Sequence, residues 1–295
     1  MTRVFDLSHV RHDPTHCLAP GLFQSLKRGK RRLLKLDITY NYNGTSIRFW
    51  GPEPLGPDDL RVLQGVVAMA AVASDIGGGG ALHLRPDTQS EEGKILRERL
   101  NLTGEAVKAS TIIAKVRLNK LAREVGFSGD GGKLFIRIRG SLERLAAVTV
   151  VVRQDQQRQK VVGGFHIISA YEIREGGEIF VALNPMLARA VIGQRAAHTI
   201  ISLSEVRRLK RGPTRILHQQ LCARIDPGKG GRSFHIDRLW GYVWPQAQED
   251  EIGGGLLSKR KAAVRKGLKE LTEIGWEVYE YAKDKFHISR PKIGT

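Results

Sequence analysis

One order of predicted elements occurs twice along the chain, and it limits the folds that the chain can adopt. In its first occurrence, apolar residues recur at helical spacing over 116–125, and Gly126 ends this predicted helix before a glycine-rich turn. A second helix follows over about 133–145. Runs of β-branched residues then predict strands at 148–152, 161–168 and 179–183. Helix, turn, helix and β-hairpin is the order of a winged helix.

The same order returns in the C-terminal third of the chain. The segment 202–205, with sequence SLSE, is typical of a capping box that opens a short helix, and another helix starts at Gly212. Asp237 is placed to cap a further short helix. A long helix over 256–274 and a hairpin over 276–290 follow. The sequence therefore predicts an α+β fold with two tandem winged-helix domains.

An N-terminal arm and a hairpin precede these two modules. Asn43-Gly44 lies between alternating segments at 36–40 and 46–50, and both residues tolerate the positive φ of a tight hairpin turn. Proline and glycine break the pattern at 51–57, and 77–93 is interpreted as a loop or an insertion. The predicted division is an arm and hairpin over 1–56, a first winged-helix domain over 57–195, and a second winged-helix domain over 196–295.

The chain carries a large excess of positive charge. Its 295 residues include 48 Lys and Arg against 30 Asp and Glu, a formal net charge of +18, and the pI is near 10.2. Such an imbalance attracts polyanions and is typical of nucleic-acid binding. A basic protein that is merely soluble and a protein that docks on an anionic membrane surface are the alternatives.

Other features bear on the compartment. Cys17 and Cys222 lie far apart and form no CxxC pair, so no disulfide framework is predicted. The N-terminus has no apolar core of the signal-peptide type. The longest apolar run, 62–76, is shorter than the roughly 20 residues that span a bilayer. We therefore predict a cytoplasmic protein with no membrane partner.

The helix predicted over 256–274 has two unlike faces. Its apolar stripe consists of Leu257, Val264, Leu268 and Leu271. Its candidate DNA contacts are Ser258, Lys259, Arg260, Lys261, Arg265, Lys266 and Lys269, with Arg260 and Lys261 placed in a first turn whose side chains splay outward. Few acids share this N-terminal half, as a helix that enters the major groove requires. A solvated surface helix is the alternative, but such helices usually mix charges of both signs.

The hairpin that follows this helix is the predicted wing. Lys283, Lys285 and His287 are expected at or near its tip, where they can touch the DNA backbone or the minor groove. A plain edge hairpin whose lysines prevent aggregation is the alternative.

The upstream helix has a thinner cationic face, formed by Lys133, Arg137, Arg139 and Arg144. These side chains either grip phosphates or belong to a solvated face in a domain used mainly for dimerisation, and the sequence leaves both open. The basic run 27–32 is either a phosphate-binding arm or a flexible linker.

Metal binding and catalysis find little support. His9, His12, His16 and Cys17 are residue types that bind zinc, but their spacing matches no known zinc pattern and no second Cys/His pair lies nearby. The chain also lacks a phosphate-binding loop, a GxSxG motif and an HExxH motif. We therefore predict no catalytic residue, no metal and no cofactor. A nicking or priming enzyme is the alternative, and it would need a metal site or a tyrosine beside a histidine pair.

Several longer runs point to a family. They are 8–14 (SHVRHDP), 16–23 (HCLAPGLF), 51–56 (GPEPLG), 181–185 (VALNP), 225–229 (IDPGK) and 241–245 (GYVWP). In these runs the chain resembles the IncQ-type plasmid replication protein C. The resemblance covers nearly the whole chain, and runs of this length are far more specific than short motifs.

The resemblance implies an initiator that binds direct repeats (iterons) in a plasmid origin and helps to open neighbouring A+T-rich DNA. It also implies partnership with the plasmid's replicative helicase and primase, and homodimerisation through the first winged helix, while the second reads iterons. The sequence departs from its relatives over 77–104 and in the recognition helix, so the iteron that it reads is not implied. The expected function is that of a sequence-specific, double-stranded DNA-binding replication initiator. A winged-helix transcriptional repressor is the alternative.

Overall fold

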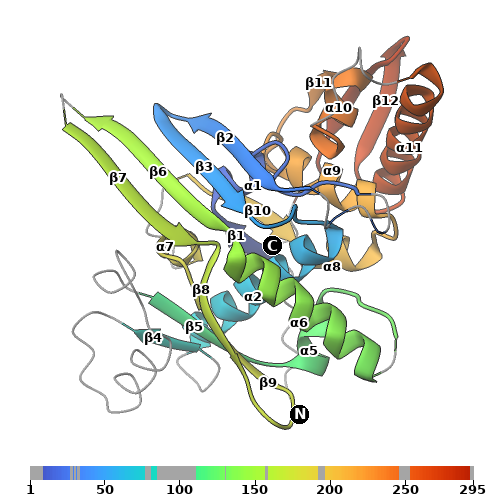
Figure 1. Ribbon diagram of the computed structural model, residues 1–295. Coiled ribbons are helices and arrows are strands. Elements are labelled where there is room, and N and C mark those ends of the chain that lie inside the picture. The colour runs from blue at the N-terminus through green and yellow to red at the C-terminus, as the bar shows by residue number, and fades with distance from the viewer. Residues whose placement is uncertain are drawn as a thin grey trace.

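The computed structural model describes residues 9–26, 29, 31, 34–76, 81–84, 111–129, 131–156, 159–191, 197–245 and 253–292. Figure 1 shows a long-stranded sheet at the upper left, a helical and hairpin unit at the upper right, and a second helical and sheet unit below. Among the helices of the described part, none combines the length and the apolar character that crossing a bilayer requires.

The N-terminal hairpin forms one side of a larger sheet. Its two strands pair around Asn43 and Gly44, whose φ angles of 46° and 76° confirm the predicted tight turn. The sheet has the order β2-β3-β6-β7. Its strands are β2 (Leu36–Tyr42), β3 (Thr45–Gly51), β6 (Thr149–Gln156) and β7 (Gln159–His166). The hairpin is therefore built into one sheet with strands from the middle of the chain.

The first winged-helix unit follows the hairpin. Helix α2 packs against α5 and α6, and the sheet has the order β4-β5-β9-β8. The elements are α2 (Pro57–Ile76), β4 (Ala81–Leu84), β5 (Thr111–Arg117), α5 (Leu118–Glu124), α6 (Gly131–Ala147), β8 (Ile168–Ile173) and β9 (Glu178–Leu183).

Two sequence-based predictions in this unit are wrong. Val116 lies in strand β5, where it pairs with Ile179, and the helix begins only at Leu118. The Val116 side chain is buried, as it would also be in the predicted helix. The apolar spacing therefore could not distinguish a strand from a helix at this position. The segment Ala81–Leu84, interpreted as part of a loop, is a strand that pairs with β5. The rest of 77–93 lies outside the described residues.

The second winged-helix unit occupies the C-terminal part. The elements are α7 (Pro185–Val191), β10 (Thr199–Ser202), α8 (Leu203–Arg208), α9 (Gly212–Cys222), β11 (Arg232–His235), α10 (Ile236–Val243), α11 (Gly254–Thr272), β12 (Glu277–Ala282) and β13 (Lys285–Ser289). Helix α9, strand β11, helices α10 and α11 and the β12–β13 hairpin follow the winged-helix order, with β13 between β11 and β12.

The helix caps of this unit agree only in part with the sequence-based predictions. The predicted cap Ser202 is confirmed, because its side chain accepts a hydrogen bond from the backbone N–H of Glu205 at 3.3 Å. The Glu205 side chain, which a full capping box would turn back to Ser202, lies 2.6 Å from Nε2 of His218. The predicted cap Asp237 is wrong. His235 occupies the N-cap of α10, and Asp237 lies one position inside the first turn, because the helix begins at Ile236.

The two units share a core. Strand β1 (His9–His12) of the arm, which leads into α1 (Pro14–Leu18), pairs antiparallel with β10 at the start of the second unit. Between α2 and α9, the side chain of Gln64 donates a hydrogen bond to Gln219 at 3.0 Å, and both are buried. The buried apolar side chains of both units form one contiguous cluster. The domain boundaries at 56 and 195 stay a prediction.

Candidate nucleic-acid interface

Helix α11 is held against the second unit by one apolar face. Val264, Leu268 and Leu271 are buried, as predicted, and α11 packs against α9 and α10. A Cβ atom at Gly267 would lie 3.1 Å from Oγ1 of Thr214, so glycine permits the close approach of α11 to α9.

A buried carboxylate that the sequence-based analysis did not single out also holds α11 in place. Glu270 accepts a hydrogen bond from Thr214 Oγ1 at 2.8 Å and from the backbone N–H of Lys210, and it lies 3.4 Å from the guanidinium of Arg211. These donors lie at the N-terminus of α9, where the helix dipole favours a negative charge. Glu270 therefore fixes the orientation of the predicted reading helix.

The opposite face of α11 is exposed and cationic. Ser258, Lys259, Lys266 and Lys269 are exposed, and none of the three lysines forms an ion pair with another residue of the described part of the chain. Lysines 259, 266 and 269 follow each other at steps of seven and three residues, so they share one side of the helix. We call these three residues the α11 lysine row.

Two residues of α11 that were predicted to contact DNA, Arg260 and Lys261, instead contact α10. The helix begins at Gly254, two residues earlier than expected, so Arg260 and Lys261 lie where its second turn meets the third, beyond the first turn in which they were predicted. Lys261 Nζ lies 2.6 Å from Asp237 Oδ1 on α10. The guanidinium of Arg260 lies over the rings of Trp240 and Trp244, at 5.7 and 5.5 Å. Both side chains therefore attach α11 to α10.

Arg265 joins α11 to the hairpin. Its guanidinium forms an ion pair with Asp284, lies 3.7 Å from Glu280, and lies 5.9 Å from the centre of the Phe286 ring. Asp284 has a φ of 62° and occupies the turn of the hairpin. Arg265 is partly exposed, but its charge is balanced within the protein.

The predicted wing residues divide into two groups. Lys283 and Lys285 are exposed at the turn between β12 and β13, as predicted, without an ion-pair partner among the described residues. The predicted position of His287 at or near the tip is wrong, because it lies in the middle strand of the sheet, opposite Ser233 and Tyr279. Its ring stacks on that of Tyr279, with the centroids 5.1 Å apart.

Helix α6 has a different kind of cationic face. Arg137 lies 3.0 Å from Asp58, Arg139 lies 2.8 Å from Glu143, and Arg144 lies 2.7 Å from Asp59. The Asp59 side chain is 0% exposed and also accepts a hydrogen bond from the backbone N–H of Gly56. Of the four predicted residues, only Lys133 is exposed without such a partner in the described part of the chain.

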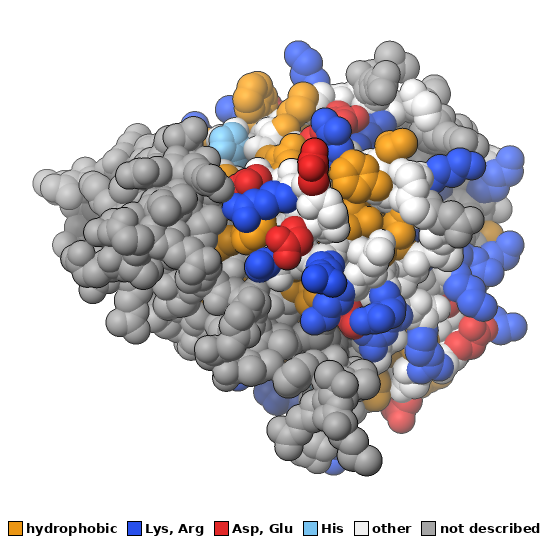
Figure 2. Space-filling model, turned by 90° about the horizontal axis from the view of Figure 1, so that it is seen from below, with side chains coloured by type: hydrophobic (Ala, Val, Ile, Leu, Met, Phe, Trp, Pro, Cys, Tyr) orange, Lys and Arg blue, Asp and Glu red, His pale blue; other side chains and the backbone are white. Residues whose placement is uncertain are grey.

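Cationic side chains are not confined to α11, since Arg48, Lys115 and Arg174 lie in or beside strands β3, β5 and β8. Seen from below the view of Figure 1, Lys and Arg side chains gather in groups toward the right of the molecule, with several Asp and Glu among them (Figure 2). Of the basic run 27–32, only residues 29 and 31 lie within the described part, and Arg31 lies 3.3 Å from Asp59. Positive charge alone therefore does not locate an interface.

His12 and His16 of the arm are structural. His12 and His16 are buried, and burial lowers the pKa of His12 from 6.5 to about 3 and that of His16 to about 4, with the charge of His16 adding to the shift of His12. Burial also raises the pKa of the Cys17 thiol. These residues are neutral parts of the core.

The comparisons with known proteins agree with the sequence resemblance. A family described as Replication protein C (RepC) matches residues 4–292. No curated protein matches the sequence. A crystal structure of selenomethionine derivatives of RctB domains 2 and 3 has a TM-score of 0.58 at 9% identity and covers 94% of this chain and 98% of that one. A second structure of RctB domains 2 and 3 has a TM-score of 0.56 at 8% identity, over 94% and 96%.

A Pi initiator protein, solved in complex with iteron DNA, has a TM-score of 0.46 at 14% identity and covers 86% of this chain and 100% of that one. The two RctB structures show that the chain shares their fold. The family match spans nearly the whole chain, and the chain therefore belongs to the replication protein C family.

Proposed function

We propose that this chain is a sequence-specific, double-stranded DNA-binding initiator that recognises the iterons of a plasmid origin. The observation that carries this proposal is the exposed α11 lysine row, which has no ion-pair partner among the described residues. The membership of the chain in the replication protein C family supports the same function. A helix whose opposite face is buried can present such a row to the major groove, where lysines reach base edges and phosphates.

The residues around α11 have separate tasks in this proposal. We assign base contacts to Lys259 and Lys266, which lie in the first two-thirds of the helix, because recognition helices meet bases through their N-terminal residues. The phosphate contacts are assigned to Ser258, Lys269, Lys283 and Lys285.

Arg265 acts through the wing. Its ion pair with Asp284 keeps the hairpin turn beside α11, and so positions the two wing lysines. We expect Arg265→Ala to weaken binding to all DNA sequences by similar factors. Arg260 and Lys261 support α11 from α10 and are not assigned to DNA.

The first unit is assigned mainly to homodimerisation, with Lys133 as a phosphate contact. We also propose that the chain opens the neighbouring A+T-rich DNA and loads the plasmid's helicase there. The plasmid's primase is a further proposed partner, and the proposed compartment is the cytoplasm. The purified chain is expected not to hydrolyse ATP or GTP, because no phosphate-binding loop occurs in its sequence.

A binding titration over salt concentration tests the central step. If roughly six to ten phosphates are contacted, the affinity for an iteron duplex should fall by roughly 10³- to 10⁵-fold between about 50 and about 200 mM salt. A scrambled duplex should bind more weakly at every salt concentration. Affinity that is insensitive to salt, or equal for the two duplexes at moderate salt, would refute the proposal.

A further inference from the structure

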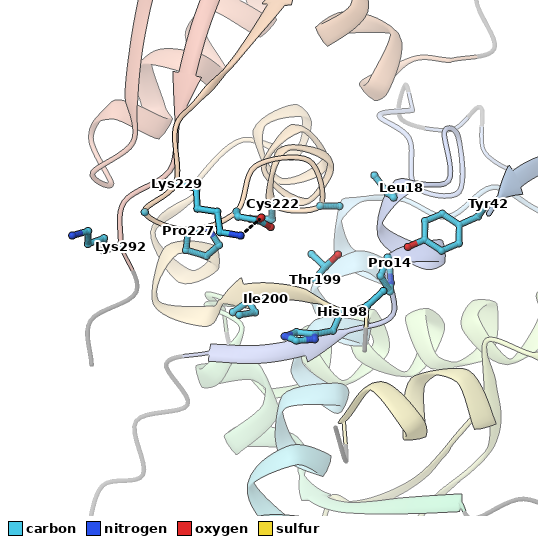
Figure 3. A pocket seen from close by; sticks show the side chains of 14 residues that line it. Pro14, Leu18, Tyr42, His198, Thr199, Ile200, Cys222, Pro227, Lys229 and Lys292 are labelled. Carbon is cyan, nitrogen blue, oxygen red and sulfur yellow. Dashed lines mark hydrogen bonds and ion pairs between the residues drawn. The ribbon is translucent and has the colours of Figure 1, made fainter. Parts of the chain in front are cut away.

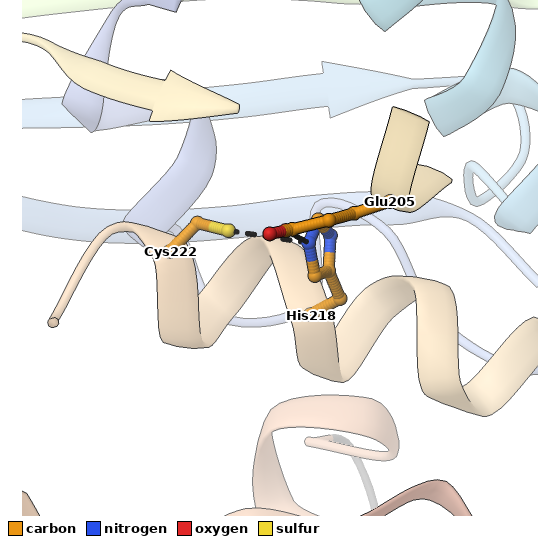
Figure 4. Close-up of side chains that lie close together, drawn as sticks. All are labelled: Glu205, His218 and Cys222. Atoms are coloured by element: carbon orange, nitrogen blue, oxygen red, sulfur yellow. Dashed lines mark hydrogen bonds and ion pairs between the residues drawn. The ribbon is translucent and has the colours of Figure 1, made fainter. Parts of the chain in front are cut away.

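Three side chains of metal-ligand type converge in the second unit, away from the α11 lysine row. They are Glu205 on α8 and His218 and Cys222 on α9 (Figure 4). Nε2 of His218 lies 2.6 Å from Oε2 of Glu205 and 3.5 Å from Sγ of Cys222, and the three ligand atoms all lie within 4.8 Å of one another. His218 and Cys222 are buried, and Glu205 is 12% exposed.

The helices place these side chains by simple geometry. His218 and Cys222 are four residues apart, so they lie one above the other on the same face of α9. Glu205 comes from the first turn of α8, whose N-terminus is fixed by the Ser202 cap. The imidazole of His218 meets the ring of Trp276 edge-on, with the centroids 5.7 Å apart, and this contact holds its orientation.

We propose that Glu205, His218 and Cys222 form a binding site for a Zn²⁺ ion. One carboxylate oxygen, one imidazole nitrogen and one thiolate are ligands that zinc accepts, and sites with three protein ligands leave the fourth tetrahedral position to another group. Among the described residues, this is the one group of three such side chains whose ligand atoms lie so close together. The histidines of the arm, which are closer to each other in sequence, form no comparable group in that part of the chain.

The proposed binding step balances in charge and in protons. Zinc binds imidazole in its neutral form and cysteine as its thiolate, so a proton held on either ligand atom leaves to solvent when the ion binds. One carboxylate, one thiolate, one neutral imidazole and Zn²⁺ together carry no net charge. Arg290, whose charge also acts on Glu205, is unchanged.

A cavity borders the proposed site at Cys222. Cys222 also lines a cavity of about 690 Å³, together with Thr199, Ile200, Lys229 and Lys292 (Figure 3). This volume is ample for an ion to enter with its water. A water molecule from this cavity can complete the tetrahedron, since the described protein ligands supply three positions.

The ion would act on the reading unit. It would tie α8 to α9, and α9 is the helix on which α11 packs. Trp276, which contacts His218, comes directly before strand β12 of the wing. Bound zinc therefore stabilises the support of α11 and of the hairpin without touching DNA.

Metal titration of the reduced, chelator-treated full chain tests the site. Co²⁺ should give the charge-transfer absorption of a cobalt–thiolate bond at one ion per chain, and Zn²⁺ should abolish it by displacement. Zn²⁺ should also raise the melting temperature, since an ion that binds only the folded state stabilises it. Cys222→Ala should abolish the absorption band. Cys17→Ala is the matched control, because it removes the other buried cysteine and should leave the band intact.

His218→Gln and Glu205→Gln keep similar side-chain volumes and give independent tests, with circular dichroism as the check of folding. Each should weaken Co²⁺ binding by more than about 100-fold, because removing a direct ligand costs more than removing an outer hydrogen-bond partner. The absence of a thiolate band in the wild-type chain would overturn the proposal. So would a band that survives Cys222→Ala or that disappears with Cys17→Ala.

Discussion

Helices α6 and α11 occupy corresponding positions in their winged-helix units, and each carries several cationic side chains. On α6, three arginines face acids of the same chain, at 2.7 to 3.0 Å. On α11, the lysine row faces no acid of the described part of the chain, while Arg265 and Lys261 are paired with the wing and with α10.

The difference shows that the number of charges on a helix says little about their use. A cation that is already paired contributes to holding its own domain together, whereas an unpaired exposed cation is available to a polyanion. The comparison therefore predicts that α6 and α11 respond differently to the same kinds of substitution. We also expect buried ionisable groups of the N-terminal half to control the free energy of unfolding. The exposed lysines of the C-terminal unit should control the affinity for DNA.

The largest expected effect concerns pH and the buried histidines of the arm. The pKa values of His12 and His16 lie below 6.5 in the folded chain, so the unfolded chain takes up protons first as the pH falls. Their stabilisation is present above about pH 6.5 and is lost as the pH falls toward 4. Each should cost about 1.4 kcal/mol per pH unit, which is roughly 4 kcal/mol for the pair at pH 5.

Denaturant unfolding at several pH values measures this slope. His12→Leu should make the pH dependence shallower by about one proton. An equal slope in the wild type and in His12→Leu would contradict the assignment.

The next effect concerns the support of α6. Asp59→Ala removes a buried carboxylate that lies near Arg144 and Arg31 and accepts a hydrogen bond from the backbone of Gly56. Breaking a buried pair in this way should lower the free energy of unfolding by about 3 kcal/mol. The matched change on α11, Lys266→Ala, should alter it by less than about 0.5 kcal/mol, because the side chain is exposed. Similar melting temperatures for both variants would remove the distinction between the two helices.

A smaller effect is expected for DNA affinity. Replacing the three residues of the α11 lysine row by alanine should weaken iteron binding by about 100-fold. It should also lower the slope of log affinity against log salt by about one for each phosphate that the variant no longer neutralises. Lys133→Ala on α6 should change that slope by no more than about one. A triple variant that binds like the wild type at moderate salt would place the interface elsewhere.

Sequence patterns predicted much of the architecture. Asn43-Gly44, the Ser202 cap and the buried residues Val264, Leu268 and Leu271 of α11 each rest on local rules, and the structure confirms all three. Val116 shows the limit of such rules, because a buried apolar residue fits the pattern of a strand as well as that of a helix. The strand at Ala81–Leu84 was missed because its pairing partner lies about thirty residues downstream.

The ion pairs between different helices and strands could not be predicted from the sequence. Asp58 and Asp59 lie on α2, far upstream of Arg137 and Arg144, so the ion pairs exist only once the helices have packed. Arg265 and Asp284 are closer, yet nothing in their spacing indicates that the turn folds back on the helix. The same holds for Glu205, whose position beside His218 and Cys222 depends on the packing of α8 on α9. Periodicity finds faces, but it does not find partners on other elements.

The most direct test of the account compares discrimination between DNA sequences in two single variants. Lys266→Ala on α11 and Arg139→Ala on α6 each remove one exposed cation, and each is titrated against iteron and scrambled duplexes at one fixed salt concentration. A base contact is worth about 1–3 kcal/mol of discrimination, so Lys266→Ala should lower the ratio of specific to non-specific affinity by about tenfold. Arg139→Ala should change both affinities by similar factors. A ratio that falls with Arg139→Ala and stays constant with Lys266→Ala would contradict the assignment of α11 as the reading helix.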